Sequence, residues 1–256
     1  MGKNYKFIGL NNYRKLIGDR TVRIALKNNL ILLVFVPLVT ISLSLLFASL
    51  LSGKKIREKK LYRILFFFPN VIAISVTSIL WSFIYHPSVG IINGFLKAVG
   101  ADFLVHTWLG ESGTVVLAIG VTMIWQAVGY YMILFIAAME GVPVDLYEAA
   151  DLEGAGTLQK FFRITLPLIR NVLNVAIIFN IIAVFNGSFT FTRIMTNGGP
   201  GYASSTFTLY TIDTAFKYNS FGMAATMAVA IMAIVILVYV FQNVVLKKVF
   251  NQEEAA

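Results

Sequence analysis

Residues 148–155, EAADLEGA, and residues 164–167, ITLP, lie on one connection between two long apolar runs of the chain. Hydrophobic residues make up 58% of the 256 residues and charged residues only 13%. This balance is too apolar for a water-soluble domain of this size and is typical of a polytopic membrane protein. Because most of the remaining chain is simply compatible with lipid, this polar connection carries the most information about which membrane fold forms.

Five apolar stretches are each long enough to cross a bilayer as a helix, which takes about 20 residues. They are continuously apolar rather than alternating, and this favours helices over a transmembrane β-barrel. We therefore predict an all-α polytopic transmembrane helical bundle that forms a single transmembrane domain over residues 1–256. The expected membrane spans are 29–51, 62–85, 114–139, 168–190 and 224–246.

The net charge of +9 does not predict a nucleic-acid partner, because the basic residues cluster beside the spans. The densest cluster, KKIREKK at 54–60, places the 52–61 connection in the cytoplasm by the positive-inside rule. Counting spans from there puts residues 140–167 inside and residues 191–223 outside. We expect a multi-pass protein surrounded by membrane lipid.

The leading segment, 1–28, is the exception to this charge pattern. It carries seven basic residues, although counting five spans places it outside the cell. Its apolar residues recur at helical spacing, which predicts an external amphipathic segment at the membrane surface. The alternative is that an earlier span, absent from this sequence, would have carried the segment across, and we favour that second interpretation.

The 140–167 connection has the pattern of a helix, a glycine break and a second helix. Pro143 suits a helix start because it has no amide hydrogen to leave unpaired, and the negative charge of Glu148 complements the helix dipole. Gly154 interrupts the helix, and Thr157 is placed to cap a second short helix. A simple linker does not require this bracket, so we predict a docking surface for a cytoplasmic partner. The alternative is a connector that rests on the membrane.

Neutral polar side chains occur in the expected spans, but no ionisable side chain lies near a span centre. Without buried acids or histidines, a proton-coupled carrier is disfavoured. Buried amides cost roughly 1–3 kcal/mol unless they are paired, so they should face the bundle interior. There they either form hydrogen bonds between helices or line a pathway for a hydroxyl-bearing substrate. These amides are Gln126 in the third span and Asn171, Asn174, Asn180 and Asn186 in the fourth.

Sites for covalent chemistry are missing from the sequence. There is no cysteine, no phosphate-binding loop of the Gly-x-x-x-x-Gly-Lys-Ser/Thr type and no Ser/His/Asp constellation. The two histidines, His86 and His106, lie in a loop between spans and are interpreted as polar loop residues rather than metal ligands. We therefore expect no catalytic site, no metal site and no cofactor bound by this chain.

The 140–167 connection resembles the characteristic cytoplasmic loop of binding-protein-dependent ABC importer permeases of the type I fold. The stretches FIGLNNY at 7–13 and TNGGP at 196–200, with Trp81 in the span between Pro69 and Pro87, are similar to the carbohydrate branch. That branch is typified by the larger maltose-transporter-type permease subunit. The resemblance covers essentially the whole chain.

The resemblance implies a subunit that forms half of the pathway of an ATP-driven importer for a sugar or oligosaccharide. It implies three partners: a second homologous permease, an ABC ATPase dimer that carries ATP and Mg, and an extracellular or periplasmic solute-binding protein. The implied location is the bacterial cell membrane. By position, the implied ATPase-coupling residues are Glu148, Ala149, Ala150, Gly154, Ala155, Leu166 and Pro167. The implied substrate-binding residues are Asn180, Phe185, Asn186 and Ser188.

Two departures from the family pattern stand out. Arg170 replaces the second proline that often follows the Leu-Pro pair, and family members usually carry one further span ahead of the first span found here. The rival interpretations are a permease of the same fold for another solute, such as glycerol phosphate, and a stand-alone membrane channel or scaffold. Glycerol phosphate is anionic and would favour a cation in the pathway, which the spans lack.

Overall fold

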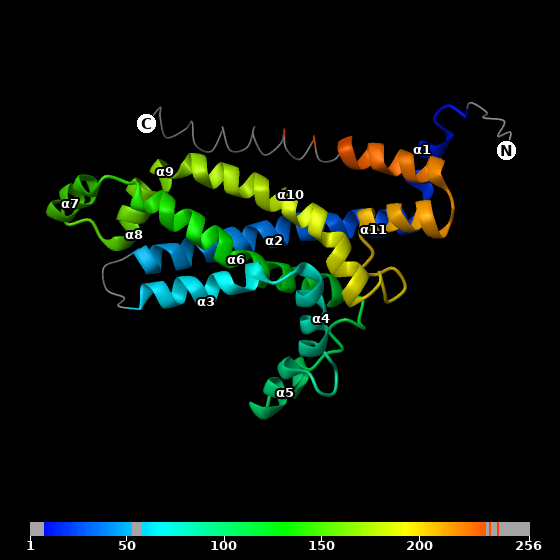
Figure 1. Cartoon of the computed structure of the whole chain (residues 1–256), viewed down its shortest axis with the longest axis horizontal. Coiled ribbons are helices and arrows are strands. Elements are labelled where there is room, and N and C mark those ends of the chain that lie inside the picture. Colours follow the sequence, from blue (N-terminus) through cyan, green and yellow to red (C-terminus); the bar gives the residue numbers. More distant parts are fainter. Residues whose placement is uncertain (1–7, 53–57, 234–235, 237–239, 241–256) are drawn as a thin grey trace.

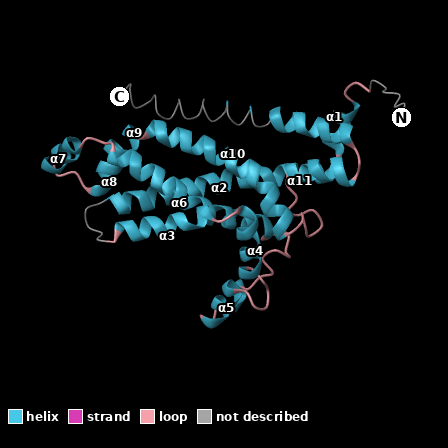
Figure 2. Cartoon of the chain, viewed as in Figure 1, coloured by secondary structure: helices cyan, strands magenta, loops and turns pink. Residues whose placement is uncertain are grey.

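The computed structural model describes residues 8–52, 58–233, 236 and 240, and these residues form helices joined by loops, with no strand among them (Figure 2). The expectation of an all-helical bundle is confirmed. In chain order the helices are α1 (Asn11–Gly18), α2 (Arg20–Ser52), α3 (Lys59–Val71), α4 (Ile74–Ile84), α5 (Ile91–Ala98), a 3₁₀ turn (Asp102–Leu104), α6 (Val115–Glu140), α7 (Val144–Leu152), α8 (Thr157–Lys160), a π turn (Phe161–Thr165), α9 (Leu166–Leu168), α10 (Arg170–Met195), α11 (Phe207–Ile212) and a second π turn (Asp213–Lys217).

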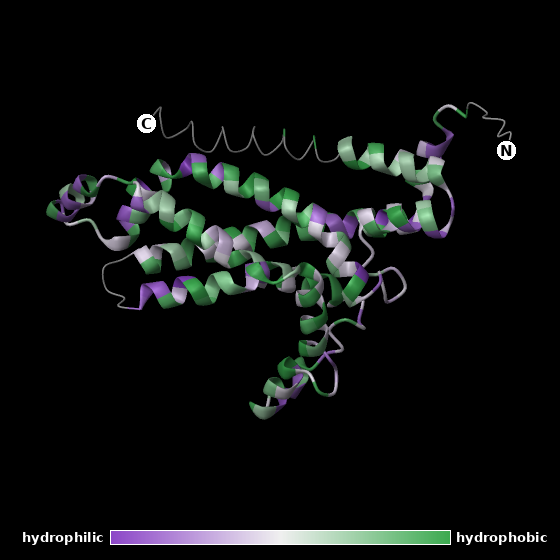
Figure 3. Cartoon of the chain, in the orientation of Figure 1, coloured by the Kyte–Doolittle hydropathy of each residue, from purple (hydrophilic) through white to green (hydrophobic). Residues whose placement is uncertain are grey.

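Within the described part of the chain, three helices, α2, α6 and α10, are long and apolar enough to cross a bilayer, and α3 with α4 would make a fourth crossing. Figure 3 shows hydrophilic residues on α1, α7, α8 and the start of α3, while the middle of the bundle is mostly hydrophobic. Part of the expected span 224–246 lies outside the described residues; the described part belongs to an apolar helix, Phe221–Ala233.

The helix that contains the first expected span, α2, begins at Arg20, ahead of residue 29, so the expected amphipathic segment is divided between α1 and the start of α2. Asp19 explains the division, because its Oδ1 accepts the backbone N–H of Thr21 at 2.7 Å and of Val22 at 3.4 Å. An aspartate in this position satisfies amides that a helix start leaves unpaired. The cap at the start of α2 therefore lies several residues before the apolar run that the helix contains.

Helix α6 is the central helix of the bundle and packs against α2, α3, α4 and α10. Two hydrogen bonds between helices reach its backbone: the Ser44 hydroxyl of α2 donates to the Val128 carbonyl at 2.8 Å, and the Tyr85 hydroxyl donates to the Ala118 carbonyl at 3.0 Å. Side-chain donors that satisfy a neighbouring helix's backbone stabilise helix pairs where lipid supplies no partner.

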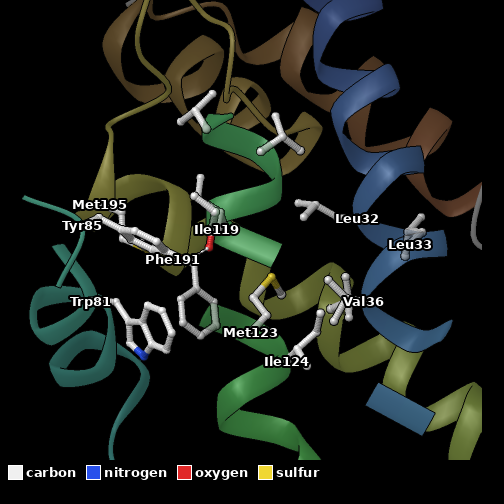
Figure 4. Close-up of a cluster of buried hydrophobic side chains, with 14 of the residues drawn as sticks. Leu32, Leu33, Val36, Trp81, Tyr85, Ile119, Met123, Ile124, Phe191 and Met195 are labelled. Atoms are coloured by element: carbon white, nitrogen blue, oxygen red, sulfur yellow. Dashed lines mark hydrogen bonds between the residues drawn. The ribbon is translucent and has the colours of Figure 1, made fainter. Parts of the chain in front are cut away.

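Two apolar clusters fill the bundle between these helices. The cluster nearer α4 contains Trp81, Met123 and Phe191, which come from three different helices and face one another (Figure 4). The other cluster is built around Phe135 of α6 and includes residues of α2 and α10. The end of α2 and the start of α3 lie at the same end of the bundle as α7 and α8, and α11 lies at the other end (Figure 1).

The second expected span, 62–85, is not one straight helix. Helices α3 and α4 are bent by 100° relative to each other, and α4 leaves the bundle at a steep angle (Figure 1). The break is stabilised from α6, because Gln126 Nε2 donates to the Ile72 carbonyl at 2.8 Å and to Thr77 Oγ1 at 3.3 Å. Of the two roles left open for Gln126, the structure thus shows a hydrogen bond between helices.

Replacing Gln126 by leucine is expected to lower the free energy of unfolding by about 1–3 kcal/mol, because the partly buried Ile72 carbonyl would lose its donor and the buried Thr77 hydroxyl would lose a partner. The measurement is the thermal midpoint of the detergent-purified protein. Thr122→Val is the control for loss of a buried hydrogen-bonding group from the same helix, since the Thr122 hydroxyl donates within α6, to the Ala118 carbonyl at 3.1 Å. Equal loss of stability in both variants would contradict this role for Gln126.

Candidate functional site

The predicted bracket of a helix, a glycine break and a second helix is present as a projection at one end of the bundle (Figure 1). Helix α7 follows Pro143, which has an extended backbone (φ −56°, ψ 130°), and Asp145 lies in its first turn. No residue of α7 is buried. A nine-residue helix with no buried side chain gains little from the chain's own core, which is typical of a surface that a partner covers.

Gly154 shapes the turn that ends α7. Its φ is +78°, in the left-handed region where glycine has no steric cost. The amide N–H of Ala155 reaches back to the Ala150 carbonyl at 2.9 Å, and that of Gly154 to the Asp151 carbonyl at 3.1 Å. These bonds satisfy carbonyls at the helix end that would otherwise lack a donor.

The start of α8 differs from the expectation, because Gly156 rather than Thr157 is its capping residue. The Gly156 N–H donates to Gln159 Oε1 at 2.9 Å. Thr157 is the first residue inside the helix, since the glycine turn ends one residue earlier than the sequence pattern predicts. A surface ion pair between Lys160 Nζ and Asp151 Oδ1, at 2.5 Å, also joins the two helices.

The outer surface of the bracket combines exposed leucines with acids. Leu152 is 91% exposed and Leu158 is 73% exposed, on either side of Gly154. Large apolar side chains seldom stay this open to water without a partner. The acids are Asp145, Glu148, Asp151 and Glu153, all exposed.

The base of the bracket is fixed to the bundle. The hydroxyls of Tyr147 and Thr165 lie 2.8 Å apart and hydrogen-bond, and Leu166 packs against the cluster around Phe135. The predicted coupling residues therefore separate into two groups. Glu148, Ala149, Ala150, Gly154 and Ala155 lie on the projecting part, whereas Leu166 and Pro167 belong to α9 at the base, which leads into α10.

The four predicted substrate residues lie on different faces of α10. Asn180 and Ser188 are buried, Phe185 is partly buried against the cluster of Trp81, and Asn186 is exposed. The Ser188 hydroxyl donates to the carbonyl of Phe185 in its own helix at 2.9 Å. The structure thus does not bring the four side chains together on one surface.

Asn180 is the residue of this set with unused hydrogen-bonding capacity. It is 1% exposed, and its Oδ1 accepts no hydrogen bond from the residues that the structure describes. Asn174 Oδ1, six residues earlier on α10, also lacks a hydrogen-bond donor among the described residues. The buried Nε1 of Trp81 likewise lacks an acceptor there. Unpaired buried polar atoms are rare in folded proteins and indicate a partner such as water or a ligand.

The C-terminal end of α10 has a clamp that sequence reasoning missed. Asn28 Nδ2 donates to the Ala203 carbonyl at 2.8 Å and to the Ser205 carbonyl at 2.9 Å. Asn29 Oδ1 accepts the Phe207 N–H at 2.7 Å. Both asparagines are buried on α2. The only sequence signal is a pair of amides at the start of an apolar run, which does not identify a loop about 175 residues away.

Further polar contacts support the same loop. Arg193 Nη1 donates to Asn197 Oδ1 at 2.7 Å, and its Nη2 to Asp213 Oδ1 at 2.6 Å. The Tyr210 hydroxyl donates to Asp19 Oδ2 at 2.8 Å. Burial, and then the neighbouring Asp19 carboxylate, raise the pKa of Tyr210 to about 12, so this donor keeps its proton at neutral pH.

Replacing Asn28 by leucine is expected to lower the free energy of unfolding by about 2–4 kcal/mol, because two buried carbonyls lose their donor. The loop around Ala203 should then be cut faster by a protease added from outside. Asn171→Leu is the control, since Asn171 is exposed on α10. Unchanged cleavage in the Asn28 variant would contradict the clamp.

Comparison with known proteins identifies relatives over nearly all of the chain. Residues 19–251 match the family described as "Binding-protein-dependent transport system inner membrane component". The probable ABC transporter permease protein YurN of Bacillus subtilis is 35% identical over 92% of this chain and 81% of its own length. The diacetylchitobiose uptake system permease protein NgcF of Streptomyces coelicolor is 36% identical over 91% of this chain and 69% of its own length. The sn-glycerol-3-phosphate transport system permease protein UgpA of Escherichia coli is 30% identical over 94% of this chain and 80% of its own length.

A solved structure has the same fold. It is a bacterial ABC transporter involved in the import of the acidic polysaccharide alginate, with a TM-score of 0.84 and 20% identity over 96% of this chain and 85% of that chain. A second structure of such a transporter, in complex with an alginate pentasaccharide-bound periplasmic protein, also gives a TM-score of 0.84 at 20% identity, over 95% and 84%.

Proposed function

Since this chain belongs to the family of binding-protein-dependent transport system inner membrane components, we propose that it forms half of the translocation pathway of an ATP-driven importer for a sugar or oligosaccharide. It is a multi-pass membrane protein with the type I ABC permease fold. The proposed location is the bacterial plasma membrane. The other half of the pathway would come from a second, homologous permease.

The observation that carries this proposal is the exposed bracket of α7 and α8. Its open leucines and acids lie on a rigid turn, and α9 joins it to α10. In the proposal an ATPase dimer binds ATP and Mg and holds this bracket in a groove. When the ATPases close, the bracket moves with them, and α10 carries the displacement through the membrane. This chain needs no cofactor or catalytic group for that role.

The proposed substrate class rests on neutral chemistry along α10. Its basic residues, Arg170 and Arg193, lie at its two ends, so the middle of the helix offers amides and aromatic rings. Asn180 supplies an unused acceptor for a hydroxyl, and Phe185 offers a flat face for a sugar ring. The relative NgcF is named for diacetylchitobiose uptake, which agrees with a saccharide. A solute-binding protein would deliver it from outside.

The second candidate is import of a phosphorylated polyol, favoured by the 30% identity to UgpA of Escherichia coli. Uptake into proteoliposomes that contain the complete transporter separates the two. Labelled diacetylchitobiose and glycerol 3-phosphate, each offered with its cognate binding protein, are the probes. Saccharide uptake that requires ATP supports the first candidate; uptake of glycerol phosphate alone supports the second. A tagged chain that retains no ATPase and no second permease from native membranes would refute both.

A further inference from the structure

Exposed cations cover the external ends of α1 and α2, and the transport proposal gives them no role. None of them forms an ion pair with any residue in the described part of the chain. Asp19, the acid beside them in sequence, is already bound to the Thr21 amide and the Tyr210 hydroxyl. These cations are Arg14, Lys15, Arg20, Arg23 and Lys27.

On α2 the cations follow one face of the helix. Arg20, Arg23 and Lys27 are spaced by three and four residues, so their side chains share a stripe. The same stripe continues along α2 with exposed apolar side chains at the same spacing. These are Leu30, Val34 and Leu38, each more than half exposed. One face of α2 therefore passes directly from cations to hydrocarbon-compatible residues.

The depth of the cations follows from helix geometry. Lys27 and Leu50 are about 35 Å apart along α2 at 1.5 Å per residue, and the hydrocarbon core is about 30 Å thick. With Leu50 near the inner boundary, Lys27 lies at the outer boundary. Arg23 and Arg20 are then about 6 and 10 Å further out, at the level of the lipid headgroups.

Helix α1 gives an independent indication of the same depth. Leu10, Tyr13 and Ile17 recur at helical spacing and are exposed, with Ile17 76% open. Such an apolar stripe flanked by Arg14 and Lys15 is typical of a helix that lies in the membrane interface. Leu16, on an adjacent face of the helix, is buried and packs on α2 through the cluster with Val22 and Phe207.

We propose that this surface binds the headgroup of an anionic phospholipid in the outer leaflet, with its acyl chain along Leu30, Val34 and Leu38. Arg23 and Lys27 contact the phosphate, and α1 covers the headgroup from outside. Exposed cations on the external side oppose the positive-inside rule, so their presence here calls for an anion at this level. A lipid fits better than an acidic protein, because the stripe enters the hydrocarbon without a break.

The test compares the complete transporter carrying Arg23→Gln and Lys27→Gln with a charge-matched control carrying Lys97→Gln and Lys217→Gln. The control cations are exposed and lie outside the stripe. Each complex is purified from membranes and placed in nanodiscs of phosphatidylcholine with or without phosphatidylglycerol. Retained lipid is counted by native mass spectrometry, and thermal midpoints are recorded. The stripe variant is expected to retain about tenfold less phosphatidylglycerol per complex than the wild type. The control is expected to retain as much as the wild type.

Several outcomes would overturn the lipid site. Equal phosphatidylglycerol retention by the stripe variant and the control would do so, and so would equal stabilisation by inorganic phosphate and by the lipid. Weaker capture of the solute-binding protein with unchanged lipid retention would assign the cations to a protein instead. The lipid readouts do not depend on substrate, so their result is separate from the outcome for the sugar-import proposal.

Discussion

Replacing Gly154 by valine is expected to reduce import at least about tenfold while the protein still inserts and folds. A β-branched residue in the left-handed conformation costs of order 1–3 kcal/mol, and Gly154 holds a φ of +78°. Nothing lies within 4 Å of an added Cβ there, so the cost is conformational and falls on the bracket. The turn would relax, and α7 would no longer present Leu152 and Glu148 in their observed directions.

Gly156→Val is the matched control for this experiment, because the same side chain enters two residues later. Gly156 has an extended backbone (φ −70°, ψ 165°), which β-branched residues tolerate, and its added Cβ also meets nothing within 4 Å. Substrate-stimulated ATP hydrolysis and uptake by the reconstituted transporter are the measurements. If both variants transport equally well, or if ATPase subunits still co-purify and uptake persists in the Gly154 variant, the docking role is wrong.

The bracket could be predicted from sequence because its signals are local. Pro143 and Gly154 act through their own backbone preferences, which do not depend on the rest of the chain. The break between α3 and α4 could not be predicted in this way. Pro69 marks a weakness in the span, yet α3 continues beyond it to Val71, and the break is stabilised by Gln126 from another helix.

The arrangement of the predicted substrate residues was even harder to predict from the sequence. A run of asparagines on one helix predicts buried amides, and Asn180 is buried as expected, but Asn186 is exposed on another face. Positions 180, 185, 186 and 188 cannot all share one side of an α-helix, because successive residues are rotated by about 100° and these four spacings spread around the helix axis. In the proposed importer, which of them a substrate meets would depend on the facing surface of a second permease, and the sequence of this chain does not contain that surface.

Replacing Gly129 by alanine is expected to prevent the bundle from assembling in its observed form, although the change adds one methyl group. The added Cβ would lie 1.8 Å from the Phe66 carbonyl oxygen, 2.3 Å from its carbon and 2.8 Å from the Phe67 Cα. These are backbone atoms of α3, so no side-chain rotation relieves the overlap. Overpacking a core typically costs about 1–3 kcal/mol when side chains can move, and the cost here should exceed that range.

Gly120→Ala, on the same helix α6, is the matched control for Gly129. Its Cβ would meet ring atoms of Phe35 at 3.0 and 3.1 Å, and a side chain can give way by a few tenths of an ångström. Detergent-purified protein should therefore show a large loss of thermal stability and of monodisperse yield for Gly129→Ala, and a small one for Gly120→Ala. Equal behaviour of the two would mean that α3 is not held against α6. The Gln126 contact to the α3–α4 break would then lose its basis, because it needs the same close approach of these two helices.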